Sequence, residues 1–286
     1  MIETPSGKGA GNENFQVGSW LLEKRLRPHV AIYYAFARAV DDIADNPELS
    51  PEEKLARLDR FANALERIEV STQDLAKAVM LRKSLVECGV PTRHGLDLIS
   101  AFKQDAIKQR YETWAELMDY CDRSASPVGR YLLDLHGEDR SLWRYSDALC
   151  NALQVINHLQ DCQDDFRLMN RVYLPLEYLR EFGADASHLD AAQASAGLRQ
   201  TFDRALSLTG DLMAEAAHLP ARLKSPRLAL ESGVIVEIAH ELMAELRRRD
   251  PLAERVELTR PQFILAAVKG VFRTLASRLY SGRRTS

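Results

Sequence analysis

Apolar residues recur at helical spacing along almost the whole chain, and this periodicity limits the fold more than any other feature. Strand-like alternation of apolar and polar residues is absent from the sequence. The 286 residues include only 14 Gly and 11 Pro, which is few for an all-β protein. We therefore predict an all-α fold. Its helices are expected over residues 28–45, 51–69, 73–88, 92–110, 113–136, 141–169, 195–218, 226–248 and 260–280.

Two short segments mark helix ends most clearly. In NPELSPEEKL, Ser50 is a typical N-cap, Pro51 follows at the first helical position, and acidic residues occupy the first turn. In FRLMNRVYLPLEYL, the helix is expected to stop at Asn170, and the chain breaks again before Pro175. We interpret the second segment as a loop that directs Arg171 back toward the preceding helix end.

The length and the 46% hydrophobic content are enough for one large core. Residues 1–14 are rich in Gly and Asn, which predicts a flexible N-terminal segment. The region 183–195 is rich in Gly, Ala, Ser and Asp and is expected at the surface. Because no interdomain linker stands out, we predict that residues 15–286 form a single domain.

Charge and cysteine content argue against several classes of protein. The formal net charge of -3 lacks the basic excess of a general nucleic-acid-binding protein. The four cysteines have neither CxxC nor zinc-site spacing, so we expect reduced thiols. The start of the sequence does not resemble a signal peptide, and no run of about 18 apolar residues is present. A cytoplasmic protein is therefore expected.

Acidic residues gather at the end of the first predicted helix, in the segment YYAFARAVDDIADN. A helix C-terminus disfavours negative charge, so these carboxylates require a compensating group. At 100° per residue, four polar side chains fall within an arc of about 60°. They are Tyr34, Arg38, Asp41 and Asp45.

A second stripe of the same kind lies in ALQVINHLQDCQDDF. Gln154, Asn157, Asp161 and Asp165 fall within about 80° on a helix whose other faces are apolar. A single Asp-x-x-x-Asp pair is usually a solvated charged face. Two such stripes, each preceded by a cation or a neutral hydrogen-bonding residue, favour a functional interpretation.

Carboxylates one helical turn apart repel each other unless a cation lies between them. Magnesium fits best, because it is held by a few carboxylates together with waters and phosphate oxygens. Arg38 and Arg171 present planar guanidinium groups that match phosphate oxygens, and Gln154 and Asn157 can add neutral donors. The pattern indicates a magnesium site that binds a diphosphate.

Three segments give the chain a resemblance to the squalene/phytoene synthase family over residues 13–281. They are YYAFARAVDDIAD, YCDRSASPVGRYLLDLHG and QVINHLQDCQDDFRLMNRVYLP. The resemblance implies an isoprenoid-synthase helical bundle around a central apolar cavity. It also implies that the two aspartate motifs face each other at the cavity mouth and hold about two or three magnesium ions.

The resemblance assigns roles by position. It implies metal-binding acids at Asp41, Asp45, Asp161 and Asp165, and a catalytic tyrosine near the reacting carbons at Tyr120. Residues expected at the diphosphate or along the substrate are Phe15, Tyr34, Arg38, Ala125, Val128, Gly129, Gln154, Asn157, Gln160 and Arg171. Three positions depart from many family members: Gln160 replaces Arg, Asn12-Glu13-Asn14 replaces Ser-x-Ser, and Ala239 replaces Tyr.

Within the family, ENFQVGSWLL, SASPVG and NHLQDC are most similar to bacterial enzymes of the hopanoid pathway. This similarity implies ionisation of presqualene diphosphate, rearrangement and capture of water to give hydroxysqualene, without NADPH. One alternative is condensation of two farnesyl diphosphates to presqualene diphosphate, or a phytoene or squalene synthase reaction. Another is a non-catalytic helical assembly or binding module.

The C-terminal helix has apolar residues at helical spacing and ends in a basic tail. We predict that its apolar face packs on the bundle. Arg278, Arg283 and Arg284 are expected to touch anionic lipid at the inner membrane face in transient contacts. Other expected partners are a prenyl diphosphate substrate and enzymes of the squalene pathway, by handover; no nucleic acid is expected.

Overall fold

The computed structural model describes residues 22–66 and 73–282, and these ranges are helical and contain no strand. An isolated bridge pairs Arg110 with Val172. The predicted all-α class is confirmed. The predicted flexible segment 1–14 and Phe15 lie outside the described residues. The longer helices are α1 (Arg27–Asp45), α2 (Pro51–Glu66), α3 (Ala76–Cys88), α4 (Arg93–Asp105), α5 (Trp114–Ser124), α6 (Ser126–Leu135), α7 (Trp143–Gln160), α8 (Cys162–Met169), α10 (Ala196–Ala216), α12 (Pro226–Arg248) and α13 (Arg260–Gly282).

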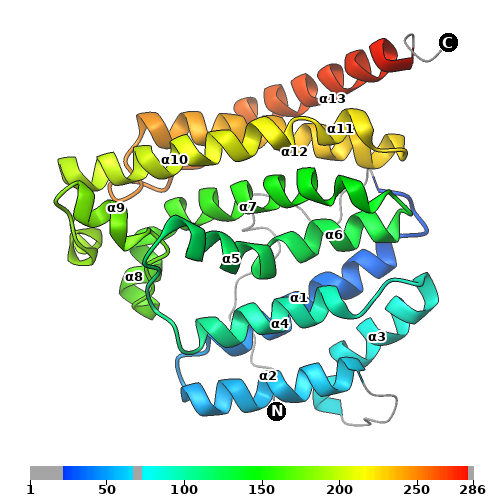
Figure 1. Cartoon of the computed structure of the whole chain (residues 1–286), viewed down its shortest axis with the longest axis horizontal. Coiled ribbons are helices and arrows are strands. Elements are labelled where there is room, and N and C mark those ends of the chain that lie inside the picture. The colour runs from blue at the N-terminus through cyan, green and yellow to red at the C-terminus, as the bar shows by residue number, and fades with distance from the viewer. Residues whose placement is uncertain (1–21, 67–72, 283–286) are drawn as a thin grey trace. The chain divides into compact units, whose positions relative to one another are not determined.

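The chain forms two compact units, of which the first comprises Met1–Lys108 and Arg123–Arg140. In its described part, α1 and α2 each pack against α3 and α4 (Figure 1). Phe36 of α1 and Phe61 of α2 are fully buried, with ring centroids 6.1 Å apart. Tyr33 of α1 stacks on Tyr131 of α6 at 4.0 Å. These contacts fix α1, which carries the first aspartate motif, in the core of its unit.

The second unit comprises Gln109–Asp122 and Ser141–Ser286. Here α7 packs against α10 and α12, and α13 packs against α12 (Figure 1). Ile156 of α7, Phe202 of α10 and Met243 of α12 are buried in this unit. The core therefore supports α7, the helix that leads into the second aspartate motif. The assignment of residues 15–286 to a single domain stays a prediction.

Helix starts follow the sequence signals closely. Ser50 Oγ accepts a hydrogen bond from the backbone N–H of Glu53 at 3.2 Å, and Glu53 Oε2 accepts one from the N–H of Ser50 at 3.0 Å. This reciprocal pair is a capping box, and it confirms the predicted start of α2. Ser225 likewise caps α12, because its hydroxyl accepts from the N–H of Leu228.

Two long predicted helices are each interrupted. The expected helix over 113–136 divides into α5 and α6 around Ala125, and Pro127 lies in the first turn of α6. The expected helix over 141–169 divides into α7 and α8 at Asp161. Three short elements were not predicted: α9 (Leu176–Glu181), η4 (Ala186–Asp190) and α11 (Leu219–Arg222). All four cysteines are free thiols, as expected.

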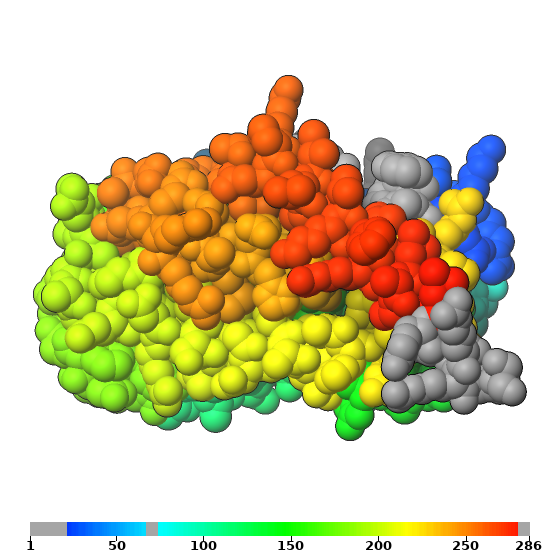
Figure 2. Space-filling model, turned by 90° about the horizontal axis from the view of Figure 1, so that it is seen from above, coloured from blue at the N-terminus to red at the C-terminus, as the bar shows by residue number. Residues whose placement is uncertain are grey.

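The prediction for the C-terminal helix was wrong about which face packs. Small residues of α13 are buried, among them Ala266, Gly270 and Thr274. A Cβ placed on Gly270 would lie only 2.5 Å from the carbonyl oxygen of Gly233 in α12, so the two backbones cross closely. The large apolar side chains of α13 remain exposed on the face seen in Figure 2, where the helix runs from orange to red.

Every helix within the described ranges is too short or too polar to cross a membrane.

Candidate active site

The first aspartate motif forms the C-terminal turns of α1. Arg38 Nη1 donates to Asp41 Oδ2 at 2.9 Å, and Arg38 Nη2 donates to Asp42 Oδ1 at 3.3 Å. The predicted polar stripe is thus present as an ion-paired cluster, although Arg38 also binds Asp42, which was not given a role. Tyr34, Asp41 and Asp45 are half-buried on the same helix. The cation required at this helix end is partly supplied by Arg38.

Asp41 lies in an environment that opposes its ionisation. Burial, followed by the charge of Asp45, raises the pKa of Asp41 from 3.8 to about 8, even though Arg38 acts in the opposite direction. Asp42 and Asp105, the last residue of α4, raise it further. The side chain nevertheless keeps 28% of its surface exposed, so a cation from solvent can reach it. A carboxyl group held in this way favours binding of a cation.

The second aspartate motif spans the junction of α7 and α8. Asp161 ends α7 and begins α8, yet its N–H donates to the carbonyl of Asn157 and its carbonyl accepts from the N–H of Asp165. These hydrogen bonds continue the helical register across the interruption, so the stripe of Asn157, Asp161 and Asp165 is retained. Gln154, Asn157, Asp161 and Asp165 are each half-buried.

The loop after α8 places Arg171 as the sequence indicated. Asn170 adopts a left-handed conformation with φ of 51°, which ends the helix. The N–H of Arg171 then donates to the carbonyl of Asp165 at 3.0 Å. The Arg171 side chain is buried, with 5% of the residue exposed. A buried arginine beside the second motif supplies positive charge at the expected diphosphate end.

An aromatic cluster in the second unit surrounds Tyr120, which is buried on α5. Tyr173, from the loop after α8, lies 5.5 Å from Tyr120 between ring centroids and stacks on His158 of α7 at 3.6 Å. Tyr111 contacts both tyrosines. The family resemblance implied a role for Tyr120, but His158 and Tyr173 were not identified from the sequence. Periodicity on α7 could not identify them, because the contact joins three separate segments.

His158 is held as a neutral imidazole. Burial, and then the charge of Arg171, lowers the pKa of His158 to about 3. Nε2 of His158 lies 3.2 Å from the amide nitrogen of Gln154. An amide nitrogen can only donate, so Nε2 accepts and the imidazole proton is assigned to Nδ1. The cluster therefore contains one polar, uncharged hydrogen-bonding group among aromatic rings.

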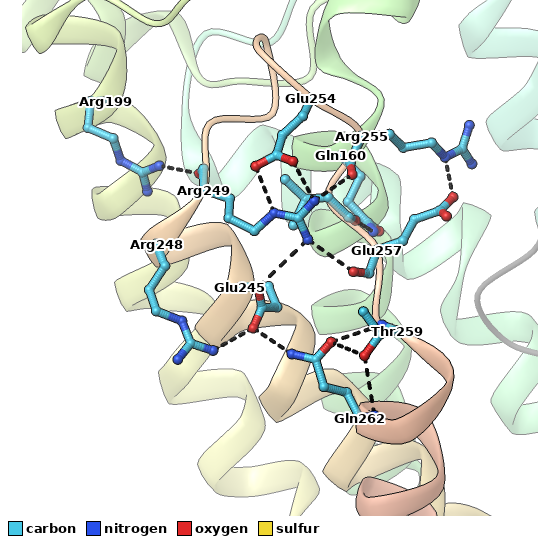
Figure 3. A network of polar contacts seen from close by, with 11 residues as sticks. Gln160, Arg199, Glu245, Arg248, Arg249, Glu254, Arg255, Glu257, Thr259 and Gln262 are labelled. Carbon is cyan, nitrogen blue, oxygen red and sulfur yellow. Dashed lines mark hydrogen bonds and ion pairs between the residues drawn. The ribbon is translucent and has the colours of Figure 1, made fainter.

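Gln160 faces another direction than the other residues of its motif. It is 8% exposed, and its amide nitrogen donates to the carbonyl of Val256 at 2.5 Å. Val256 belongs to the segment after α12, where Arg249 pairs with Glu254 and Glu245 (Figure 3). Gln160 thus anchors this segment to the end of α7. The structure gives it a positioning contact, and its predicted role at the diphosphate stays a prediction.

The other residues singled out from the sequence lie at the start of α6 and in α12. Ala125 and Gly129 are buried at the start of α6, and Val128 is half-buried beside them. Ala239 is fully buried in α12. The first motif and these α6 residues belong to the first unit, whereas Tyr120 and the second motif belong to the second.

The carboxylates fit magnesium by the chemistry of their donors. Within the described residues, His, Cys, Asp and Glu side chains form no group of three that could enclose a metal ion. Magnesium commonly takes one or two carboxylates and completes its shell with waters and substrate phosphates. Asp41 matches this requirement, since a cation would offset both the burial of its charge and the repulsion from Asp45.

Comparisons with known proteins agree with these features. Residues 9–262 match the family model described as squalene/phytoene synthase. The hydroxysqualene synthase of Zymomonas mobilis is 43% identical over 96% of this chain and 91% of its own length. The hydroxysqualene synthase of Rhodopseudomonas palustris is also 43% identical, over 93% of this chain and 90% of its own.

A solved structure shows the same fold. The squalene synthase of Alicyclobacillus acidocaldarius superposes with a TM-score of 0.74 at 34% identity, covering 84% of this chain and 90% of that chain. The predicted isoprenoid-synthase helical fold is thereby confirmed. Taken with the two aspartate motifs, these similarities establish that the chain belongs to the squalene/phytoene synthase family.

Proposed function

We propose that this enzyme converts presqualene diphosphate and water to hydroxysqualene and diphosphate, in a magnesium-dependent reaction. The observation that carries the proposal is a difference between two relatives from one organism. The chain is 43% identical to the hydroxysqualene synthase of Zymomonas mobilis over 278 residues. It is 30% identical to the presqualene diphosphate synthase of the same organism, over 180 residues.

The reaction breaks the bond between carbon and the diphosphate oxygen, and the electron pair leaves with the diphosphate. The carbocation rearranges, a water oxygen forms the new C–O bond, and the water loses a proton. Bound magnesium would stabilise the negative charge that develops on the leaving diphosphate. Asp41, Asp45, Asp161 and Asp165 are proposed to hold it. Arg38, Arg171 and Asn157 would bind diphosphate oxygens by charge-assisted and neutral hydrogen bonds.

The aromatic cluster is suited to the cationic part of the reaction. The faces of Tyr120 and Tyr173 can stabilise a carbocation electrostatically. His158 stacks on Tyr173 and stays neutral, so it adds no positive charge that would repel the cation. Its Nδ1–H can donate to the oxygen of an incoming water. We therefore assign His158 to positioning the water, with Gln154 fixing the imidazole through Nε2.

Labelled water distinguishes this reaction from its alternatives. Purified protein receives presqualene diphosphate and magnesium in oxygen-labelled water, without a nicotinamide. We expect the label in the alcohol product. Formation of squalene only after NADPH is added would contradict the proposal. Farnesyl diphosphate is tested separately: presqualene diphosphate accumulating from it, with no alcohol formed in the first reaction, would favour the condensing alternative. No turnover of either substrate would favour a binding module.

A further inference from the structure

Exposed apolar side chains concentrate on α13. Of the eleven large hydrophobic residues that are exposed in the described part of the chain, seven lie on this helix. Val268 is 61% exposed and Phe272 is 73% exposed. Figure 2 looks onto this face, where the side chains of α13 form the surface. Single exposed apolar residues are ordinary, but a continuous set on one helix marks an interaction surface.

These residues form one stripe along the helix axis. At 100° per residue, six of them fall within an arc of about 100°, and the seventh, Phe263, lies outside it. The buried residues Ala266 and Gly270 lie on the opposite side, where α13 crosses α12. We call the set the apolar stripe. It consists of Ile264, Leu265, Val268, Phe272, Leu275 and Leu279.

Cations border the apolar stripe on both sides. By the same arithmetic, Lys269 lies about 40° beyond one edge of the stripe, and Arg273 lies about 80° beyond it, toward α12. Arg260 and Arg278 lie about 40° beyond the other edge. The sequence contains no Asp or Glu from residue 260 to its end. The helix therefore presents an apolar band with Lys269 on one side and Arg260 and Arg278 on the other, while α12 packs against the side that carries Ala266 and Gly270.

Neighbouring elements neutralise only part of this charge. Lys269 and Arg273 both pair with Glu237 of α12, and Lys269 also lies 3.7 Å from Glu241. Burial raises the pKa of Glu237, but the two cations outweigh it and the pKa is lowered, so Glu237 is ionised. Arg278 donates to the carbonyls of Leu223 and Lys224, which leaves its positive charge in place. Two acids of α12 thus balance Lys269 and Arg273, and the net positive charge beside the stripe comes from Arg260 and Arg278.

We propose that α13 docks the protein on an anionic lipid bilayer, lying along the surface with the apolar stripe in the headgroup–acyl boundary. Helices that bind in this manner combine an apolar face with flanking Lys and Arg, which meet the lipid phosphates. A second copy of the chain is a weaker candidate for this face. Antiparallel pairing of two stripes face to face would bring Arg260 and Arg278 of one copy against the same residues of the other, and like charges in an interface are unfavourable.

Vesicle flotation of the full chain tests the proposal. The vesicles contain either phosphatidylcholine alone or equal parts of phosphatidylcholine and phosphatidylglycerol. We expect wild type to float with the anionic vesicles at low salt, and less with them at high salt or with neutral vesicles. Val268→Asp places a like charge against the lipid and removes apolar contact, so it should lower the partition coefficient at least about tenfold.

Val86 supplies the matched control, because it is a valine that is 76% exposed and belongs to α3 of the first unit, not to the stripe. Val86→Asp should bind vesicles as wild type does, and circular dichroism checks that both variants are folded. Equal binding by the two variants, or no flotation of wild type with anionic vesicles, would overturn the proposal. Sedimentation provides the second measurement: a dimer that Val268→Asp dissociates, without vesicle binding, would assign the stripe to self-association instead.

Discussion

Burial of Asp41 and its closeness to Asp45 predict that its ionised form lowers stability when no metal is bound. A carboxyl group whose pKa is raised on folding binds more protons in the folded state, so stability without metal falls as pH rises from about 4 to 8. Asn resembles the protonated form and removes this dependence. We expect Asp41→Asn to match wild type near pH 4 and to be increasingly more stable up to about pH 8. Urea unfolding in chelator at several pH values measures it.

The opposite result would identify Asp41 as a structural partner of Arg38. In that case Asp41→Asn would be less stable than wild type at every pH above 4, because the ion pair at 2.9 Å would be lost without compensation. The two outcomes differ in sign, so the comparison does not depend on the size of the shift.

His158 should control where the product gets its oxygen. His158→Phe preserves a flat ring for stacking on Tyr173 but removes the Nδ1–H donor. Loss of one hydrogen bond of about 1 kcal/mol predicts that the share of alcohol among the products falls about fivefold. Consumption of presqualene diphosphate should change less, because the diphosphate-binding residues are intact. Mass spectrometry measures the share of alcohol among the products, and His188→Phe in η4 is the control. An unchanged ratio would remove His158 from this role.

At the scale of elements, the crossing of α12 and α13 depends on glycine. A Cβ on Gly270 would meet the carbonyl oxygen of Gly233 at 2.5 Å and Val234 Cα at 2.7 Å, and backbone atoms cannot move aside cheaply. Gly270→Ala should therefore destabilise the protein by about 1–3 kcal/mol. Gly210 of α10 is the matched control, since its nearest neighbour lies 3.9 Å away.

Gly210→Ala should gain up to about 1 kcal/mol through higher helix propensity, so the two Gly→Ala changes differ in sign. Urea unfolding midpoints of the two variants, compared with that of wild type, measure both changes in stability. Equal effects would mean that the crossing is looser than the backbone distances indicate.

This crossing also explains where sequence reasoning was limited. The periodicity of residues 260–280 correctly predicted a helix with an apolar side, but not which side meets the bundle. Close approach to α12 selected the small residues Gly270 and Ala266, and the large ones were left outside. Local signals succeeded where they act locally, as in the capping box at Ser50. The interruption at Asp161 was missed because a change of one residue's dihedral angles leaves the apolar spacing intact.

In the candidate site too, contacts within one helix could be predicted from the sequence, whereas contacts between distant segments could not. Arg38 and Asp41 could be placed on one helix face from the sequence because helical spacing alone brings them together, and the structure shows them as an ion pair. The stacking of Tyr173 on His158 could not be predicted, because it depends on how the loop after α8 returns to α7. Gln160 was expected at the diphosphate from its position in the motif. Its contact with Val256 involves a residue 96 positions away, and no spacing rule reports such a contact.

For the whole molecule, the two aspartate motifs should respond to one ligand although they lie in different units. Binding to the folded state alone raises stability by about 2.7 kcal/mol at a hundredfold excess over Kd. We expect magnesium together with inorganic diphosphate to raise the melting temperature of wild type more than either does alone. Asp41→Asn and Asp161→Asn should each lose most of this increase. Turnover should fall at least about a hundredfold in each, equivalent to roughly 2.7 kcal/mol of transition-state stabilisation.

Asp164→Asn is the control, because Asp164 is exposed on α8 between the two predicted ligands and has no assigned role. It should retain both the melting shift and wild-type turnover. Loss of the shift in only one of the two test variants would mean that the other motif does not bind the metal–diphosphate pair. If both Asp41→Asn and Asp161→Asn retained wild-type turnover, the two aspartates would have no role in catalysis. Each substitution removes almost no volume. Without ligand we expect Asp161→Asn to melt as wild type does and Asp41→Asn to melt at the same temperature or higher, because it removes the buried carboxylate. A melting temperature not below that of wild type therefore separates loss of binding from loss of fold.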